Sequence, residues 1–457
     1  MAGGTWTAQN KVRPGVYINY KSAAASIATM GERGTVVIPK QLSWGEVGKF
    51  ITIESPDDCM TKLGYSSTDE KMLFVREILR GTNRTNGAKK ILIWRLECDG
   101  AKAATATGQM LLKAKQVGTR GNDLTVSVAH ENEDEKAEES NSIVTVYLGA
   151  KAVETIVAPS TTKPKDISSD WVEFTTDVES ETLESYTGVS ATLSGGSDGT
   201  TADVSIYDDF ISKLRTVAFD VLIYDGADAT LKSTFASFVK SQSNDEGMRC
   251  QCVLSDYASA DNECTISCAP QALTLDTGEA LTAEQLTWWV GGASAGANVF
   301  ESLTYSAHPA AVDIEPKYTK SEQEAHINAG DFALIAQYDK VQVLTDINSF
   351  TTFAVEKGKA FRKNRVVRTV FGLCNDIYKA FSLYYIGAVH NDEEGRKSLK
   401  AEILNIMNQY QGNRALQNVV ADDVTVSKGT DSDAVIIEIN CQPVDSIEKI
   451  YINITIS

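Results

Sequence analysis

Residues 219–225 read FDVLIYD, residues 229–240 read ATLKSTFASFVK, and residues 248–254 read MRCQCVL. The first and third stretches are short apolar runs of the kind that form strands buried on both faces. The stretch between them has the apolar spacing of an amphipathic helix. Because strand and helix alternate over these lengths, this part of the chain predicts βαβ units and a parallel sheet.

Before this stretch, the spacing of apolar residues along the chain changes twice between patterns typical of helices and of strands. Residues 207–214 have helical spacing, and residues 90–96 read as a strand. A further helix is expected to start at residues 67–70, which have the spacing of a capping box. Between about 110 and 190, short strands alternate with polar loops, which indicates a small β-sandwich. Its expected strands are 124–128, 143–148 and 171–174.

The chain after the βαβ stretch predicts further helices and a hairpin. A helix over residues 283–290 is expected to end in the glycine-rich run 291–296. The segments expected beyond it are two helices, at about 366–386 and 392–410, and a hairpin of residues 424–426 with 435–439.

Both ends of the sequence have the pattern of a strand. Isoleucines at alternate positions near the C-terminus share one face, and residues that suit an exposed surface occupy the other. The expected strand residues are Val16, Tyr17, Ile18, Asn19 and Tyr20 at one end, and Ile450, Tyr451, Ile452, Asn453, Ile454, Thr455 and Ile456 at the other. Most chain ends fray, whereas a strand edge can pair with another chain. The pattern leaves open whether these strands pair within their own subunit or with a neighbour.

Composition narrows the class of protein. The 457 residues carry a formal net charge of −18, from 61 acidic and 43 basic residues, which argues against general nucleic-acid binding. No apolar run approaches about 18 residues, so no membrane insertion is expected. The N-terminal residues lack the basic start and apolar stretch of a signal peptide. Eight cysteines in a chain of this length do not suggest a disulfide framework, and a reducing cytoplasm is the expected place of synthesis.

Residues 195–199 read GGSDG and match the G-x-S-x-G pattern of a nucleophile elbow around Ser197. An elbow needs an apolar strand that leads into the serine and a helix that leaves it. Residues 189–194 (VSATLS) are polar instead, and none of the four histidines has a neighbourhood that marks it as a base. A glycine-rich turn between domains is favoured, and a catalytic Ser197 in an α/β hydrolase-like enzyme is the alternative.

Two other clusters allow a functional and a structural interpretation. Cys250, Cys252, Cys264 and Cys268 fall within nineteen residues, but the first pair lies in an expected strand, which favours small buried thiols over zinc. A P-loop, a dinucleotide fingerprint and an HExxH helix are absent, so no metal or cofactor is expected. Residues 357–368 contain six basic residues and no acid, which fits either a solvated helix face or a docking surface for an acidic partner.

Four segments resemble contractile phage tail sheath proteins. Trp6 with residues 10–19 (NKVRPGVYIN) resembles the start of these proteins, and residues 118–122 (GTRGN) look like their G-x-x-G-N segment. Residues 193–199 (LSGGSDG) look like their L-x-G-G-x-D-G segment, and residues 446–452 (SIEKIYI) are similar to their ending. The segments occur in the expected order over nearly the whole chain. The resemblance is greatest to the compact sheaths of prophage tails and phage-tail-like bacteriocins.

The resemblance implies an α+β multidomain fold. It joins a subtilisin-like α/β domain with a parallel sheet, an inserted β-sandwich, and an α+β C-terminal domain with strand-forming arms at both ends of the chain. The implied domains are an N-terminal arm and linker (1–25), the first part of the α/β region (26–105), the β-sandwich (106–193), the subtilisin-like domain (194–345) and a tube-facing C-terminal domain (346–457). The subtilisin likeness is one of fold and not of activity.

The resemblance also implies a non-enzymatic, mechanical function. Arms at residues 16–20 and 450–456 would add strands to a sheet in neighbouring copies, and the helical sheath would contract to drive a tail tube through a cell envelope. The implied partners are further copies of the chain, the tail tube protein, and baseplate and tail terminator proteins. Candidate tube contacts are Lys359, Arg362, Lys363, Arg365 and Arg368. Assembly would occur in the cytoplasm of the producing bacterium, before release as a virion or phage-tail-like particle. A sheath subunit of a related secretion or injection system is the second alternative.

Overall fold

The computed structural model describes residues 31–105, 110–131, 140–175, 181–200 and 203–456. The strand predicted at residues 16–20 lies outside them. The described residues divide into two compact units: the larger lies within residues 32–371 and 445–456, and the smaller within residues 372–444 together with Gly31. No helix within the described residues is long and apolar enough to cross a membrane.

A seven-stranded sheet organises the larger unit, with the strand order β17-β13-β12-β11-β1-β3-β2. Neighbouring strands are parallel except for β2 with β3. The strands are β1 Thr35–Lys40, β2 Phe50–Ile53, β3 Lys90–Arg95, β11 Val221–Ile223, β12 Gln251–Ser255, β13 Thr265–Cys268 and β17 Asp331–Phe332. β11 and β12 lie in the apolar runs 219–225 and 248–254, and their parallel pairing confirms the predicted sheet.

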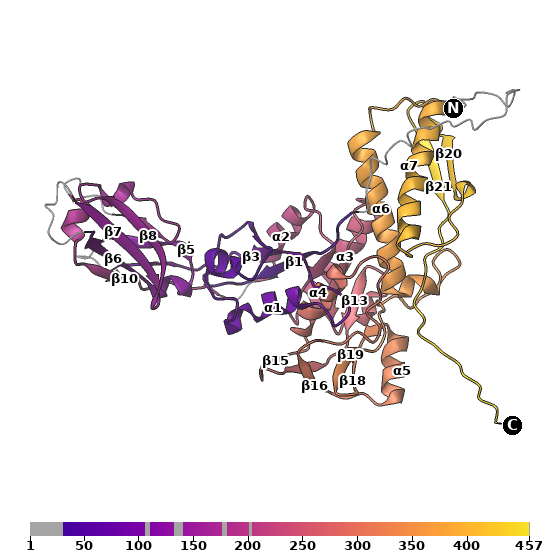
Figure 1. The fold of residues 1–457 in the computed structure, drawn as a ribbon, viewed down its shortest axis with the longest axis horizontal. Helices are drawn as coiled ribbons and strands as arrows, with labels where there is room; N and C mark the ends of the chain where they lie inside the picture. Colours follow the sequence, from indigo (N-terminus) through magenta and orange to yellow (C-terminus); the bar gives the residue numbers. More distant parts are fainter. Residues whose placement is uncertain (1–30, 106–109, 132–139, 176–180, 201–202, 457) are drawn as a thin grey trace, which may run out of the picture. The chain divides into compact units, whose positions relative to one another are not determined.

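Helices cover both faces of this sheet (Figure 1). On one face, α1 (Leu73–Arg80) and α4 (Leu286–Gly296) pack with Val36 and Ile38 of β1. On the other face, α2 (Ile206–Leu214) and α3 (Ala229–Asn244) pack with Val37. Successive side chains of a strand point to opposite faces, so one strand supplies two separate cores.

The prediction that a helix ends before the glycine-rich run 291–296 is wrong, because α4 continues through to Gly296. A Cβ atom on Gly292 would lie 2.1 Å from the carbonyl oxygen of Ile78 in α1. A Cβ atom on Gly296 would lie 2.1 Å from the carbonyl oxygen of Gly87. The glycines therefore allow close packing, which here outweighs a loss of helix propensity of about 1 kcal/mol per glycine.

Two sheets form a β-sandwich, with the strand orders β10-β6-β7-β8 and β4-β5-β9. The strands are β4 Lys102–Ala104, β5 Leu112–Val117, β6 Leu124–His130, β7 Asn141–Leu148, β8 Lys151–Pro159, β9 Val172–Phe174 and β10 Ser190–Thr192. Alternate residues such as Val126 and Val144 are buried in its core with Trp171. The predicted sandwich and its three expected strands are confirmed.

Smaller elements complete the larger unit. They are β14 Ala272–Leu275, β15 Ala280–Leu281 and β16 Ala311–Glu315 in one sheet, β18 Leu334–Gln337 with β19 Lys340–Val343 in another, and helix α5 Lys320–Ala329. Helix α5 begins at a capping box in which Thr319 and Glu322 each bond the other's backbone. The helix has no buried residue, so its sequence lacks the apolar stripe by which the other helices were predicted.

The smaller unit contains α7 (Glu393–Gly412) and the hairpin of β20 (Val424–Lys428) with β21 (Val435–Ile439), and α6 (Asn364–Tyr384) contributes residues to both units. Both helices and the hairpin were predicted and are confirmed. Within the smaller unit, the hydroxyl of Tyr410 donates a 2.7 Å hydrogen bond to Asp376.

Candidate functional site

The C-terminal arm, residues 450–456, has no helix or strand in the described chain and is exposed along its whole length. The exposed fractions of its isoleucines are 74% for Ile450, 75% for Ile452, 84% for Ile454 and 93% for Ile456. Side chains of this kind are usually buried. The structure therefore does not show the pairing within its own subunit that the sequence left open for this end.

The segment just before the arm is held to the body of the larger unit. Glu448 forms an ion pair with Lys363. The hydroxyls of Thr304 and Thr345 donate hydrogen bonds to the same carboxylate, at 2.9 and 3.5 Å. Two residues earlier, the hydroxyl of Ser446 accepts a 2.8 Å bond from the Arg365 guanidinium. These six residues are called the clasp.

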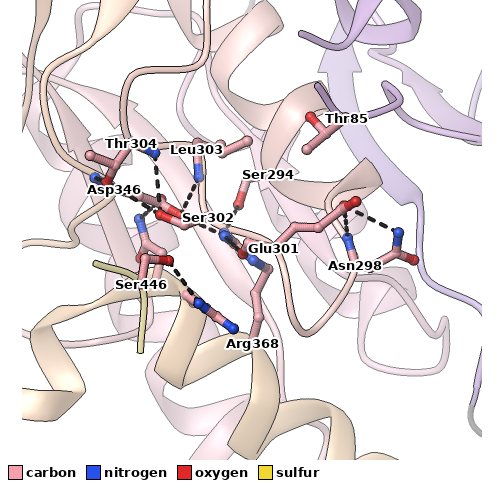
Figure 2. Close-up of polar contacts among 12 residues, drawn as sticks. Thr85, Ser294, Asn298, Glu301, Ser302, Leu303, Thr304, Asp346, Arg368 and Ser446 are labelled. Carbon is pink, nitrogen blue, oxygen red and sulfur yellow. Dashed lines mark hydrogen bonds and ion pairs between the residues drawn. The ribbon is translucent and has the colours of Figure 1, made fainter. Parts of the chain in front are cut away.

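A buried ion pair lies next to the clasp (Figure 2). Arg368 Nη2 lies 2.5 Å from Asp346 Oδ2, and at most 1% of either side chain is exposed. Arg368 also donates to the Glu301 carbonyl at 2.9 Å, and Asn364 donates to Asp346 at 2.9 Å. Several donors thus offset the cost of burying both charges.

Thr304 is the clasp residue that contacts this buried pair. Its hydroxyl donates to Glu448 and accepts a 2.9 Å hydrogen bond from the backbone N–H of Asp346. Because a hydroxyl can donate and accept at once, one side chain serves both contacts. The clasp is therefore tied to a rigid part of the body.

The basic run has a different role from the one expected. Arg368 is fully buried and Arg362 is 8% exposed, with its pKa lowered by burial. Lys363 and Arg365 bond the chain's own C-terminal segment. Of the candidate tube contacts only Lys359 is exposed. Arg362 and Arg368 are therefore corrected as candidate tube contacts, because their side chains are buried. Tube contact at Lys359 stays a prediction.

Ser197 lies in a turn that joins the β-sandwich to the rest of the larger unit. Its hydroxyl is exposed and accepts a 3.2 Å bond from Gly199 N–H, and its backbone pairs with Ala101. Neighbouring Asp198 accepts hydrogen bonds from the Thr119 backbone and hydroxyl, at 2.7 and 2.8 Å, and from the Ser43 hydroxyl at 3.0 Å. This geometry fits the expected interdomain turn.

The segments 118–122 and 193–199, singled out for their resemblance, meet at this turn. Asn122 donates to the Gly196 carbonyl at 3.0 Å and accepts from its N–H at 2.7 Å. Burial would raise the pKa of Asp198, but the hydrogen bonds from Thr119 and Ser43 outweigh it and lower the pKa. Both segments therefore fasten the sandwich to the body.

The four clustered cysteines are buried free thiols. Burial raises the pKa of Cys252 and of Cys264 to about 12, and raises those of Cys250 and Cys268 well above the usual value. In this metal-free environment the four groups are therefore protonated thiols at neutral pH. Within the described residues, no group of three or more potential ligands is placed to hold a metal ion.

The hairpin in the smaller unit offers an acceptor for a strand. β20 and β21 form a two-stranded sheet, and no third strand of the described chain pairs with it. A cavity of about 280 Å³ lies beside the hairpin. Its apolar lining is Phe381, Tyr385, Ile386, Val389, Leu399, Val435 and Ile437, and this cavity is called the groove.

Four family models match the chain in succession. They are described as the tail sheath protein Gp18 domain III N-terminal region (residues 33–96), the phage tail sheath protein beta-sandwich domain (98–198), the phage tail sheath protein central domain (200–349) and the phage tail sheath C-terminal domain (356–457).

Relatives and solved structures agree with these matches. The chain is 32% identical to the phage-like element PBSX protein XkdK of Bacillus subtilis, over 100% of both chains. The sheath tail protein of Desulfitobacterium hafniense is 38% identical, with a TM-score of 0.78 over 96% of this chain and 99% of that one. The helical sheath of the anti-feeding prophage, solved in its contracted state, has the same fold at 13% identity, with a TM-score of 0.56 over 97% and 98% of the two chains.

Proposed function

The chain belongs to the contractile phage tail sheath family, and on that premise we propose that its copies assemble into a helical sheath around a tail tube and contract to drive the tube through a target envelope. Members of this family are structural subunits of phage tails or phage-tail-like particles. The alternative of a hydrolase that uses Ser197 has no supporting observation in the geometry of the turn.

The exposed C-terminal arm carries this proposal. An extended segment with four exposed isoleucines on alternate positions is suited to pair along a sheet edge and bury one face. The two-stranded hairpin of a neighbouring copy has such edges, whose unpaired N–H and C=O groups can pair with an added strand. A strand added beside β21 (Val435–Ile439) would place isoleucines over the groove, whose lining includes Val435 and Ile437.

Residues 16–20 form the second arm of the proposal and would pair with another copy in the same way. The partners would be neighbouring sheath subunits, the tube protein, and the baseplate and terminator proteins at the ends of the sheath. Lys359 is the remaining candidate for contact with the tube. The particle would be assembled in the bacterial cytoplasm and then released.

Contraction would be driven by free energy stored at assembly, so no nucleotide is needed. Subunits would move as rigid bodies while their backbone ladders persist, as in other transitions between two packed states. The anti-feeding prophage sheath, which has the same fold and was solved in its contracted state, supports this proposal. The mainly parallel seven-stranded sheet supports the subtilisin-like topology, and the residue ranges of the five domains stay as predicted from the sequence.

Electron microscopy of negatively stained, purified chain tests the proposal. We expect hollow striated cylinders, in the contracted form because no tube is present. Variants that lack residues 1–20, or residues 446–457, should remain folded and monomeric by circular dichroism and gel filtration, because both keep every helix and strand of the described chain. Neither should form cylinders. Normal cylinders from both truncated proteins would refute the exchange of arms.

A further inference from the structure

Glu448 is held far more firmly than its position near the end of the chain suggests. Its side chain is only 15% exposed, and Lys363, Thr304 and Thr345 all donate to its carboxylate. These donors come from three separate segments of the larger unit. A carboxylate with a charged donor and two hydroxyl donors makes the stronger class of hydrogen bond.

Side chains alternate between the body and solvent along residues 446–448, which shows how this segment is oriented on the body. Ser446 and Glu448 both bond the body, whereas Ile447 between them is 86% exposed. This is the arrangement of an extended strand with one face on the body. From Lys449 to Ile456 the residues are exposed, so the arm leaves the body immediately after Glu448.

The surface beneath the clasp is held by a buried network of hydrogen bonds. Thr304 accepts from the backbone of Asp346, and Asp346 is fixed by Arg368 and by the 3.0 Å hydrogen bond from Leu303 N–H (Figure 2). A displacement of Glu448 would leave Lys363, 25% exposed, without the carboxylate that it bonds here. Loss of one partner of such a pair is costly because the other stays partly desolvated.

We propose that the clasp fixes the point and the direction in which the C-terminal arm leaves its own subunit, with Glu448 as the positioning residue. This inference rests on the proposed exchange of arms. A short arm that starts from a fixed point searches a smaller volume than one on a loose tether, so its effective concentration at a neighbour's sheet edge is higher. The clasp thereby aligns the arm for capture.

Trypsin provides a direct measurement of the clasp, because Lys449 follows Glu448 and cleavage there releases residues 450–457. Lys449 is exposed, but a protease binds several residues on each side of the bond that it cleaves. Cleavage therefore requires Glu448 and Ser446 to detach from the body, and its rate follows the population of the detached form. In Glu448→Gln we expect this peptide to appear about tenfold faster by mass spectrometry, since a charge-assisted contact is weakened.

Three controls accompany the measurement. Free peptides of residues 442–457 with Glu or Gln at position 448 give the intrinsic preference of trypsin, by which the rates are corrected. Glu279→Gln removes an ion pair of similar exposure, with Arg76 at 2.6 Å, and should leave the release rate unchanged. The exchange variant Lys363→Glu with Glu448→Lys restores an opposite-charge pair. Because its second substitution adds a trypsin site, its rate is corrected with a third free peptide that has Lys at position 448, and the corrected release should be slow again.

The same proteins are then compared for assembly. The concentration at which Glu448→Gln forms cylinders should rise by about tenfold, and the exchange variant should recover part of this loss. Equal corrected release rates in wild type and Glu448→Gln would overturn the clasp. Faster release with unchanged assembly would overturn its positioning role. A wild-type chain that never assembles would count against the proposed function, while the release rates would still decide whether the clasp holds the arm.

Discussion

Asp261 shows how one carboxylate can order a loop in this protein. It occupies the left-handed region, with φ of 43°, and its Oδ1 accepts from the Thr351 N–H at 2.7 Å, the Thr351 hydroxyl at 3.0 Å and the Thr352 N–H at 3.0 Å. Burial would raise the pKa of Asp261, but hydrogen bonds from Thr352 and Thr351 outweigh it and lower the pKa to about 2.

The lowered pKa predicts a pH dependence of stability. Because the folded state favours the ionised carboxylate, Asp261 stabilises the fold fully above the unfolded-state pKa of about 3.9, and this contribution is lost as the pH falls toward about 2. Asp261→Asn keeps a residue that tolerates the left-handed conformation and removes the charge. Urea unfolding should show the variant less stable at pH 6, with a smaller difference at pH 3. A difference that stays constant with pH would contradict this account.

Individual site residues were only partly predictable from the sequence. The basic run 357–368 is visible as a run of charge, but the acids that bind it lie far away in the chain. Lys363 and Glu448, for example, are 85 residues apart. Burial of Arg368 depends on the same long-range packing. The resemblance of residues 446–452 to the family's ending was the one signal that pointed to Glu448.

Periodicity predicted the elements that contribute a regular apolar face. The parallel strands, the sandwich strands and α7 (Glu393–Gly412) all match their expected patterns. Two failures have physical causes: α5 (Lys320–Ala329) buries no side chain, and the glycine run 291–296 continues a helix because close packing requires small residues. Local propensity could not reveal either of these tertiary contexts.

Packing between α1 (Leu73–Arg80) and α4 (Leu286–Gly296) predicts the effect of a single methyl group. In Gly292→Ala the added carbon would meet the Ile78 carbonyl, and overpacking should lower the free energy of unfolding by about 1–3 kcal/mol. Gly412→Ala is the matched control, because a Cβ atom there meets nothing within 4 Å, and it should leave stability unchanged or raise it by up to about 1 kcal/mol. Chemical denaturation measures both, and equal stabilities would show that α4 can shift.

If the sheath assembles through the C-terminal arm, the effect of proline substitutions on assembly should alternate from one residue of the arm to the next. In a strand paired along one edge, alternate N–H groups point to the partner, and proline removes the N–H. Proline placed at successive positions from 450 to 456 should therefore prevent cylinders at alternate positions. Alanine in the same series is the control and should weaken assembly only on the isoleucine face. Equal tolerance of proline at every position would exclude strand pairing.

The exposed arm and the open hairpin edge also determine how a filament must stop. Under the proposed exchange, each copy would offer an arm to one neighbour and an edge to another. Such a contact is head-to-tail, and in a helical sheath it would leave the filament open at both ends. Inside a filament every arm is matched. At one terminus, however, arms remain without edges, and at the other, edges remain without arms. The two ends of the filament would therefore expose different unpaired groups. The end with free arms would need a capping protein that supplies a sheet edge, and the end with free edges would need one that supplies a strand.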